Sequence, residues 1–176
     1  MKNSFNVLVT RKLHRSALKQ LDKKFNVVVH SGKIPIPKNT LLKRISQSHG
    51  LICHPYDKID RDVIQAGKNL KIISTFSVGF DHIDIGFAKS RGIKIGYTPE
   101  VLTNATAELT IALILDIMRR VSEGDRLIRN KRWKQVFGAH DYTGIEVSGK
   151  TIGILGMGRI GKEVCKKANG LGMKVV

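Results

Sequence analysis

The stretch GKTIGILGMGRIGKEVCKKANGLGMKVV, residues 149–176, decides how the fold is interpreted. A short apolar run at residues 151–155 leads into Gly156, Gly158 and Gly161, which have the spacing GxGxxG, and an amphipathic segment begins at once. In such a strand-turn-helix unit, the first glycine permits a tight turn and the second lets a pyrophosphate approach the backbone. The third lets the helix pack on its strand. The stretch therefore predicts a dinucleotide-binding turn, with a purely structural glycine turn as the alternative.

The chain closes soon after this unit. Gly170 and Gly172 are expected to end the helix, and residues 173–176 predict the opening of a second parallel strand. The residue that contacts the cofactor ribose or its phosphate lies at the tip of that strand, about 20 residues past the glycines. Because this position would follow Val176, the choice between NAD and NADP stays open. We expect the chain to be the N-terminal part of a longer protein.

Upstream of this unit, short apolar runs alternate with amphipathic segments. The expected strands are residues 5–10, 25–29, 51–53, 71–75 and 93–95. Asp60 and Asp84 are placed to cap two of the intervening helices, because aspartate accepts hydrogen bonds from first-turn amides. The alternation predicts an α/β fold with a doubly wound parallel sheet. Ligands bind at the carboxyl ends of strands in such sheets, which singles out the loops at residues 54–59 and 76–81.

The next stretch has a different pattern. Thr103 or Asn104 is expected to cap a helix that reaches Val121, and apolar residues cover most of its circumference. A helix of this kind is buried between layers or domains, so we place a domain boundary near Thr98. The polar, basic residues 124–149 predict a turn-rich arm that packs on a partner subunit.

Composition limits the class of protein. The chain has 176 residues and a formal net charge of +17, but its lysines and arginines are spread over all expected elements. We interpret them as a solvated face, with nucleic-acid binding as the less favoured alternative. No apolar run of about 18 residues could span a membrane, and the start lacks the apolar segment of a secretory signal. We therefore expect a cytoplasmic protein without membrane association, in which Cys53 and Cys165 are free thiols.

Two groups of residues are candidates for ligand contact. In the loop FSVGFD, residues 76–81, Gly79 permits a turn with exposed amides, and adjacent amides can hold a carboxylate. A simple turn is the alternative there. Thr106 and Glu108 lie early in the long helix, where a cap or a satisfied core pair is the commoner role. His82 is interpreted as ordering its loop rather than as a general base, and the histidines show no metal-ligand spacing, so we expect no metal site.

Longer stretches carry a family resemblance. Residues 74–120, STFSVGFDHIDIGFAKSRGIKIGYTPEVLTNATAELTIALILDIMRR, together with GKTIGILGMGRIGKEV from Gly149, resemble the D-isomer-specific 2-hydroxyacid dehydrogenases. Within them, YTPEVLTNATAEL from Tyr97 is most similar to glyoxylate/hydroxypyruvate reductases. The resemblance implies a flavodoxin-like, parallel-sheet substrate lobe at residues 1–98 and the truncated start of a Rossmann NAD(P)-binding domain at residues 99–176. Within the second part it implies an interdomain helix at residues 104–121, a dimer arm at residues 124–149 and the glycine-rich unit at residues 150–172.

The resemblance also implies roles for individual residues. By position, Val78 and Gly79 donate their amides to the substrate carboxylate, and Tyr56 lines the substrate pocket. Thr106 lies near the cofactor. The pyrophosphate of NAD or NADP is held by the glycine turn, namely Gly156, Gly158, Arg159, Ile160 and Gly161. The implied reaction is the reduction of a small 2-oxo acid, glyoxylate or hydroxypyruvate, to the 2-hydroxy acid, in an enzyme that forms homodimers when whole.

The family's catalytic arginine and its glutamate and histidine pair lie beyond the second Rossmann strand. Arg119, Glu108 and His140 do not match their positions, so we assign no catalytic residue and expect the chain alone to be inactive. Substrate orientation and proton transfer are each worth orders of magnitude in rate. The uncovered apolar faces of the long helix and of residues 152–155 also predict poor folding and aggregation.

Three alternatives stay open at this point. The chain could belong to another enzyme of the same family, a phosphoglycerate or D-lactate dehydrogenase. It could be a non-catalytic dinucleotide-binding module. The high positive charge leaves nucleic-acid association as the third.

Overall fold

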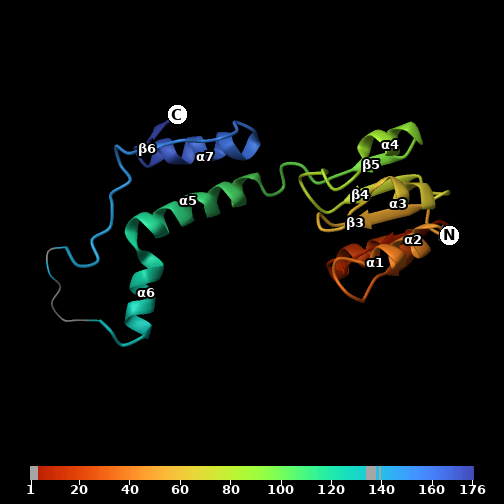
Figure 1. Cartoon of the computed structure of the whole chain (residues 1–176), viewed down its shortest axis with the longest axis horizontal. Helices are drawn as coiled ribbons and strands as arrows, with labels where there is room; N and C mark the ends of the chain where they lie inside the picture. Colours follow the sequence, from red (N-terminus) through yellow and green to blue (C-terminus); the bar gives the residue numbers. More distant parts are fainter. Residues whose placement is uncertain (1–3, 134–137, 139) are drawn as a thin grey trace. The chain divides into compact units, whose positions relative to one another are not determined.

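The computed structural model describes residues 4–133, 138 and 140–176, and the chain divides into two compact units, Met1–Pro99 and Glu100–Val176 (Figure 1). Residues 134–137 and 139, which belong to the predicted arm, lie outside the described residues.

The first unit is built on a five-stranded parallel sheet. Its strands are β1 (Asn6–Val9), β2 (Asn26–Val29), β3 (Gly50–Cys53), β4 (Ile72–Thr75) and β5 (Lys94–Gly96). Their order in the sheet is β2-β1-β3-β4-β5, which is the flavodoxin-like order. The prediction of an α/β fold with a parallel sheet is therefore confirmed.

Four helices connect these strands. They are α1 (Arg15–Lys24), α2 (Lys38–Ile45), α3 (Arg61–Ala66) and α4 (Ile85–Ser90). The predicted caps are confirmed, because the Asp60 carboxylate accepts from Val63 N–H at 3.2 Å and the Asp84 carboxylate accepts from Phe87 N–H at 2.9 Å. Each cap satisfies a first-turn amide that has no partner within its own helix.

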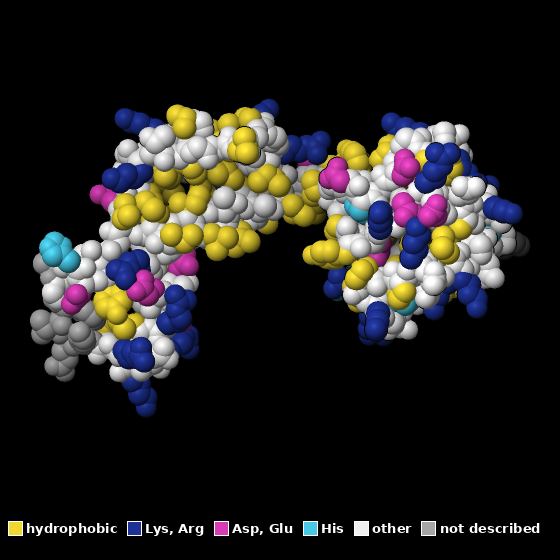
Figure 2. Space-filling view, in the orientation of Figure 1, with side chains coloured by type: hydrophobic (Ala, Val, Ile, Leu, Met, Phe, Trp, Pro, Cys, Tyr) yellow, Lys and Arg dark blue, Asp and Glu magenta, His cyan; other side chains and the backbone are white. Residues whose placement is uncertain are grey.

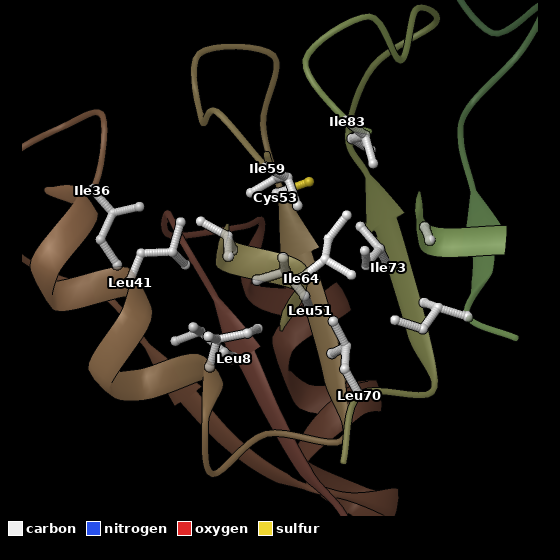
Figure 3. Close-up of a cluster of buried hydrophobic side chains, with 14 residues drawn as sticks. Leu8, Ile36, Leu41, Leu51, Cys53, Ile59, Ile64, Leu70, Ile73 and Ile83 are labelled. Atoms are coloured by element: carbon white, nitrogen blue, oxygen red, sulfur yellow. The ribbon is translucent and has the colours of Figure 1, made fainter. Parts of the chain in front are cut away.

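The core of the first unit lies on one face of the sheet. Leu8 and Leu51 come from the central strands, and they converge with Leu41 of α2 and Ile64 of α3 (Figure 3). Helix α1 contributes no buried residue. Between α1 and the sheet lies an apolar groove of about 420 Å³, and Ile72 on this side is 45% exposed.

The second unit contains more helix than sheet. Its elements are α5 (Thr103–Arg119), α6 (Val121–Arg129), β6 (Thr151–Ile152), α7 (Arg159–Gly170) and β7 (Lys174–Val175). Strands β6 and β7 pair in parallel, as the strand-turn-helix prediction requires, and α7 packs against α5. Its buried apolar core consists of Val147, Ala168 and Met173.

Three sequence predictions for this unit are wrong. No side chain caps α5, and its N-cap residue is Leu102 rather than Thr103 or Asn104. The chain enters α5 through a turn in which Thr103 N–H donates to Glu100 O at 3.1 Å, so Thr103 already lies inside the helix. The long helix does not continue to Val121, because Arg120 is left-handed with φ of 57° and ends it.

The beginning of the predicted arm is also not turn-rich, since residues 121–129 form α6. The Asp116 carboxylate accepts from both Ser122 N–H and Ser122 Oγ–H, at 2.6 and 2.7 Å. This acceptor comes from the preceding helix and satisfies the first turn of the new one. The hydrogen bonds also lower the pKa of Asp116.

The burial expected of α5 between layers or domains is not present in this chain. Only Ala107 of α5 is buried, and Ile117 is 75% exposed. Figure 2 shows hydrophobic side chains gathered over α5 and α7. The exposed fractions of the α5 side chains agree instead with the expectation that the apolar face of this helix is uncovered in this chain. None of the described helices is long and apolar enough to span a membrane.

Candidate functional site

The glycine turn of the second unit requires glycine at two positions for structural reasons. Gly156 has φ of 98°, a conformation that side chains of L-residues rarely adopt. At Gly161, an added Cβ would lie 2.2 Å from Gly156 O. The first and third glycines of the motif thus serve the turn and the close contact between helix and strand.

Gly158 has no such structural reason. Its φ of −74° and ψ of −168° suit any residue, and an added Cβ would meet no atom within 4 Å. Gly158 is the N-cap of α7, and no side chain caps this helix. The first turn therefore offers free amides beside open space, which is the arrangement that binds a phosphate group at a helix N-terminus.

The other predicted cofactor residues lie in the same unit. Arg159 and Ile160 occupy the first turn of α7, and Arg159 Nε lies 3.4 Å from the Glu100 carboxylate in an exposed ion pair. Thr106 is half-buried near the start of α5, and its carbonyl accepts from Thr110 Oγ1–H at 2.8 Å. Glu108 pairs with Lys167 at 3.4 Å, and this contact joins α5 to α7.

The loop predicted to hold a carboxylate follows β4 in the first unit. Ser77 Oγ–H donates to Gly79 O at 2.6 Å, and Ser77 O accepts from both Thr98 N–H and Thr98 Oγ1–H at 3.0 Å. Within the described residues, the N–H groups of Val78 and Gly79 donate to no acceptor. Two adjacent amides in a fixed turn can bind an anionic oxygen.

His82 lies behind this loop. Its Nε2 is 2.9 Å from Thr75 Oγ1 and 4.0 Å from Cys53 Sγ. Burial lowers the pKa of His82, although Asp57 and Asp81 oppose this shift. Burial likewise raises the pKa of the Cys53 thiol to about 12, so Cys53 is not a nucleophile at neutral pH. These contacts agree with a loop-ordering role for His82.

The two strand-end loops of the first unit meet. The ring of His54 packs against Phe76 at 5.3 Å between centroids, and Ile59 N–H donates to His82 O at 2.8 Å. His54 Nε2 is buried and has no hydrogen-bond partner among the described residues, and burial lowers the pKa of His54. Tyr56 of the same loop is 71% exposed.

Asp57 is a residue that the sequence analysis missed. It is buried, and its carboxylate accepts from Thr10 Oγ1–H and from His54 N–H, the latter at 2.9 Å. It therefore ties the end of β1 to the loop after β3. An aspartate in a loop already singled out at a strand end was the available signal. Among the described residues, no group of three or more histidine, cysteine, aspartate or glutamate side chains could hold a metal.

Comparisons with known proteins agree with this arrangement. The family described as D-isomer specific 2-hydroxyacid dehydrogenase, catalytic domain, matches residues 7–171. The glyoxylate reductase of Thermofilum pendens is 44% identical over 171 residues, which is 97% of this chain and 50% of that protein. A crystal structure of a protein from Thermus thermophilus has a TM-score of 0.88 and 45% identity, covering 97% of this chain and 54% of that one.

A third relative is more distant and carries ligands. The structure of D-lactate dehydrogenase from Aquifex aeolicus, complexed with NAD and lactic acid, has a TM-score of 0.78 and 25% identity, covering 97% of this chain and 50% of that one. The chain spans about half the length of the relatives it matches. With a flavodoxin-like parallel sheet, a glycine turn at the start of α7 and a family match over most of its length, the chain belongs to the D-isomer specific 2-hydroxyacid dehydrogenases.

Proposed function

We propose that this chain carries the carboxylate-binding loop and the cofactor-phosphate turn of an NAD(P)-dependent dehydrogenase. The whole enzyme reduces a small 2-oxo acid, glyoxylate or hydroxypyruvate, to the 2-hydroxy acid. The observation that carries the proposal concerns Gly158. Neither its backbone conformation nor a close contact requires glycine at this position, and it lies at the N-terminus of a helix that no side chain caps. The identity to a glyoxylate reductase supports the choice of substrate.

In the second unit, the amides of the first turn of α7 hold the pyrophosphate of the dinucleotide. Gly156 and Gly161 shape the turn, Gly158 leaves room for the phosphates, and Arg159 and Ile160 complete the cradle. Thr106 lies near the cofactor. The bound nicotinamide supplies the hydride. NAD and NADP are both candidates, and NAD is favoured by the bound cofactor of the Aquifex aeolicus D-lactate dehydrogenase.

In the first unit, the amides of Val78 and Gly79 bind the substrate carboxylate. They are free to do so because neither donates a hydrogen bond within the described part of the chain. Tyr56, exposed in the neighbouring loop, lines the substrate pocket. These contacts orient the 2-oxo acid, and this chain supplies no residue that we assign to proton transfer. We therefore expect the chain alone to bind ligands without turnover.

Three further parts of the proposal concern the whole enzyme and its setting. It forms a homodimer, to which residues 124–149 contribute the arm. Its cytoplasmic location agrees with two free cysteines. A D-lactate dehydrogenase activity is the second candidate, because a D-lactate dehydrogenase has the same fold over 97% of this chain.

The test of the dinucleotide site is Gly158→Ala. NADH binding is measured by calorimetry, and the fold is checked by thermal melting of the same samples. Because the new methyl group meets no protein atom within 4 Å, we expect an unchanged melting temperature. We expect NADH affinity to fall by at least about tenfold, or 1.4 kcal/mol, because the methyl group occupies the phosphate space.

Gly170→Ala, at the far end of the same helix, is the matched control and should bind NADH as the unmodified chain does. Equal affinity of the Gly158→Ala variant would contradict the assignment of this turn to the cofactor. If the unmodified chain binds no NADH, the chain does not form a dinucleotide site by itself. Turnover of glyoxylate, hydroxypyruvate and pyruvate is then measured for the chain and for the longer enzyme. Turnover by the chain alone would refute its expected inactivity.

A further inference from the structure

A continuous line of hydrogen bonds leads from the half-buried His82 to the carboxylate-binding loop. His82 Nε2 lies 2.9 Å from Thr75 Oγ1, and Thr75 Oγ1 lies 2.6 Å from Ser77 Oγ. Ser77 Oγ lies 2.6 Å from Gly79 O. Thr75 is 1% exposed, so water does not compete for its hydroxyl.

The number of protons along this line decides its direction. Gly79 O can only accept, so the Ser77 hydroxyl donates its single proton to that carbonyl. The contact between Ser77 and Thr75 must then use the hydroxyl proton of Thr75. With that proton committed, Thr75 can only accept from His82 Nε2, which therefore carries a hydrogen.

The last link closes a small ring around the two amides. The hydroxyl of Ser77 binds the carbonyl of Gly79, so the N–H groups of Val78 and Gly79 lie within the closed segment. The carbonyl of Ser77 is held from the other side by two hydrogen bonds from Thr98. Ser77 is thus fixed at both its side chain and its main chain.

We infer that His82, Thr75 and Ser77 are positioning residues, which form a one-way hydrogen-bond chain that fixes the amides of Val78 and Gly79 for the substrate carboxylate. This inference rests on the proposed carboxylate-binding role of the loop. It assigns to His82 a task in substrate binding that requires no proton transfer to the substrate. Preorganised donors bind an anion without first having to order the loop, which is the source of their effect on affinity.

The surroundings of His82 favour a neutral ring, which serves the hydrogen-bond chain as the tautomer that carries hydrogen on Nε2. Cys53 lies 4.0 Å from Nε2, and its thiol is protonated at neutral pH because burial raises its pKa. Asp57 and Asp81 are the charged groups that act on His82, and both oppose the loss of its proton. Burial outweighs them and lowers the pKa of His82. The neutral ring then has hydrogen on Nε2 and none on Nδ1.

The first test is the tautomer of His82 in the ¹⁵N-labelled chain. A long-range proton-nitrogen correlation spectrum at neutral pH should show Nε2 protonated and Nδ1 unprotonated. A ring protonated at Nδ1 alone would overturn the inference, because Nε2 could then only accept and the proton count would fail.

The second test is the order of the two amides, measured by ¹⁵N relaxation. Ser77→Ala removes the last link from an exposed loop, and Thr75→Val removes the middle link with little change in shape. Both should lower the order parameters of the Val78 and Gly79 amides from the rigid range near ~0.85 toward ~0.6 or below. Thr75→Ser, which keeps a hydroxyl, should retain the order of the unmodified loop.

The matched control is Ser90→Ala, since Ser90 Oγ–H also donates to a nearby carbonyl, Phe87 O, at 2.8 Å, in a remote turn. This variant should leave the Val78 and Gly79 amides unchanged. If Ser77→Ala and Thr75→Val also leave them unchanged, the inference is overturned.

Oxalate is the probe for the carboxylate role, titrated at constant ionic strength against chloride because the chain is strongly basic. It should shift the Val78 and Gly79 amide signals of the unmodified chain and of Thr75→Ser. Its affinity should fall by at least about tenfold in Thr75→Val and Ser77→Ala. If oxalate shifts neither amide while the first two tests succeed, the hydrogen-bond chain stands and the proposed carboxylate role falls.

Discussion

The two units of the chain differ in how much apolar surface they bury for themselves. The first packs 14 buried residues into one core beneath a five-stranded sheet, while the core of the second, within its described residues, contains three. Many of the second unit's large apolar side chains are exposed instead, among them Leu155 and Ile117. The second unit therefore depends on a few close contacts, whereas the first depends on a continuous core.

The difference also separates the two candidate ligand loops. The Val78 and Gly79 amides are held by side-chain hydrogen bonds in a unit with a complete core on one face of its sheet. The amides at the start of α7 are held by glycine geometry in a unit with little core. We expect the first loop to be rigid before its ligand arrives, and the second to gain stability from its ligand, because a ligand stabilises the folded state that it binds.

The largest effect should come from the core of the first unit. Leu51→Ala removes a buried side chain from the central strand β3, and we expect the free energy of unfolding to fall by about 3 kcal/mol. Urea unfolding of the 176-residue chain measures this loss. Ile72→Ala, on the neighbouring strand but 45% exposed, is the control and should lower it by less than about 1.5 kcal/mol. Equal losses would show that the sheet has no one-sided core.

A smaller effect is expected from the glycine turn of the second unit. Gly161→Ala places a methyl group 2.2 Å from Gly156 O, so the backbone must shift, and we expect a loss of about 1–3 kcal/mol. Gly170→Ala lies in the same helix with nothing within 4 Å, and should instead stabilise it by about 0.5–1 kcal/mol. Hydrogen exchange of the α7 amides measures both changes. The close approach of helix and turn would be refuted by a neutral Gly161→Ala variant.

The pH dependence should also distinguish the units. In the first, burial lowers the pKa of both His54 and His82, so the unfolded chain binds their protons more readily. The free energy of unfolding is then highest above the ordinary histidine pKa of about 6.5, and it falls as the pH drops through that value.

In the second unit, hydrogen bonds lower the pKa of the Asp116 carboxylate and of the Glu123 carboxylate. Protonation of these two carboxylates lowers the free energy of unfolding only at a pH near and below about 4.3. Hydrogen exchange between pH 7.5 and 5 should therefore show loss of protection in the first unit alone. His82→Gln and His54→Gln should each make the protection of the first unit less dependent on pH. If both variants show the same pH dependence as the unmodified chain, its assignment to these histidines is contradicted.

The sequence alone predicted the features whose causes are local. The alternation of apolar runs predicted the strands, and Asp60 and Asp84 were recognised as caps because each satisfies an amide three residues away. The glycine spacing predicted the strand-turn-helix unit. In each case, the chemistry that forms the feature lies within a few residues along the chain.

Features that depend on partners distant in sequence could not be predicted. Asp57 joins the end of β1 to the loop after β3, and its partner Thr10 lies 47 residues away. The break at Arg120 moved the end of α5 and started α6, and the sequence pattern does not show it because apolar residues continue through the break. The exposure of α5 depends on how much of its surface the rest of the chain covers.

The sequence by itself determined the order of elements and the glycine turn, since periodicity, capping and motif spacing are written along the chain, and the resemblance of its longer stretches indicated the family. Only the tertiary structure decided the rest. It placed His82 behind the carboxylate loop, set the direction of the hydrogen bonds through Thr75 and Ser77, and showed that Gly158 faces open space. Those properties depend on distances and burial, which arise when strands far apart in sequence pack side by side.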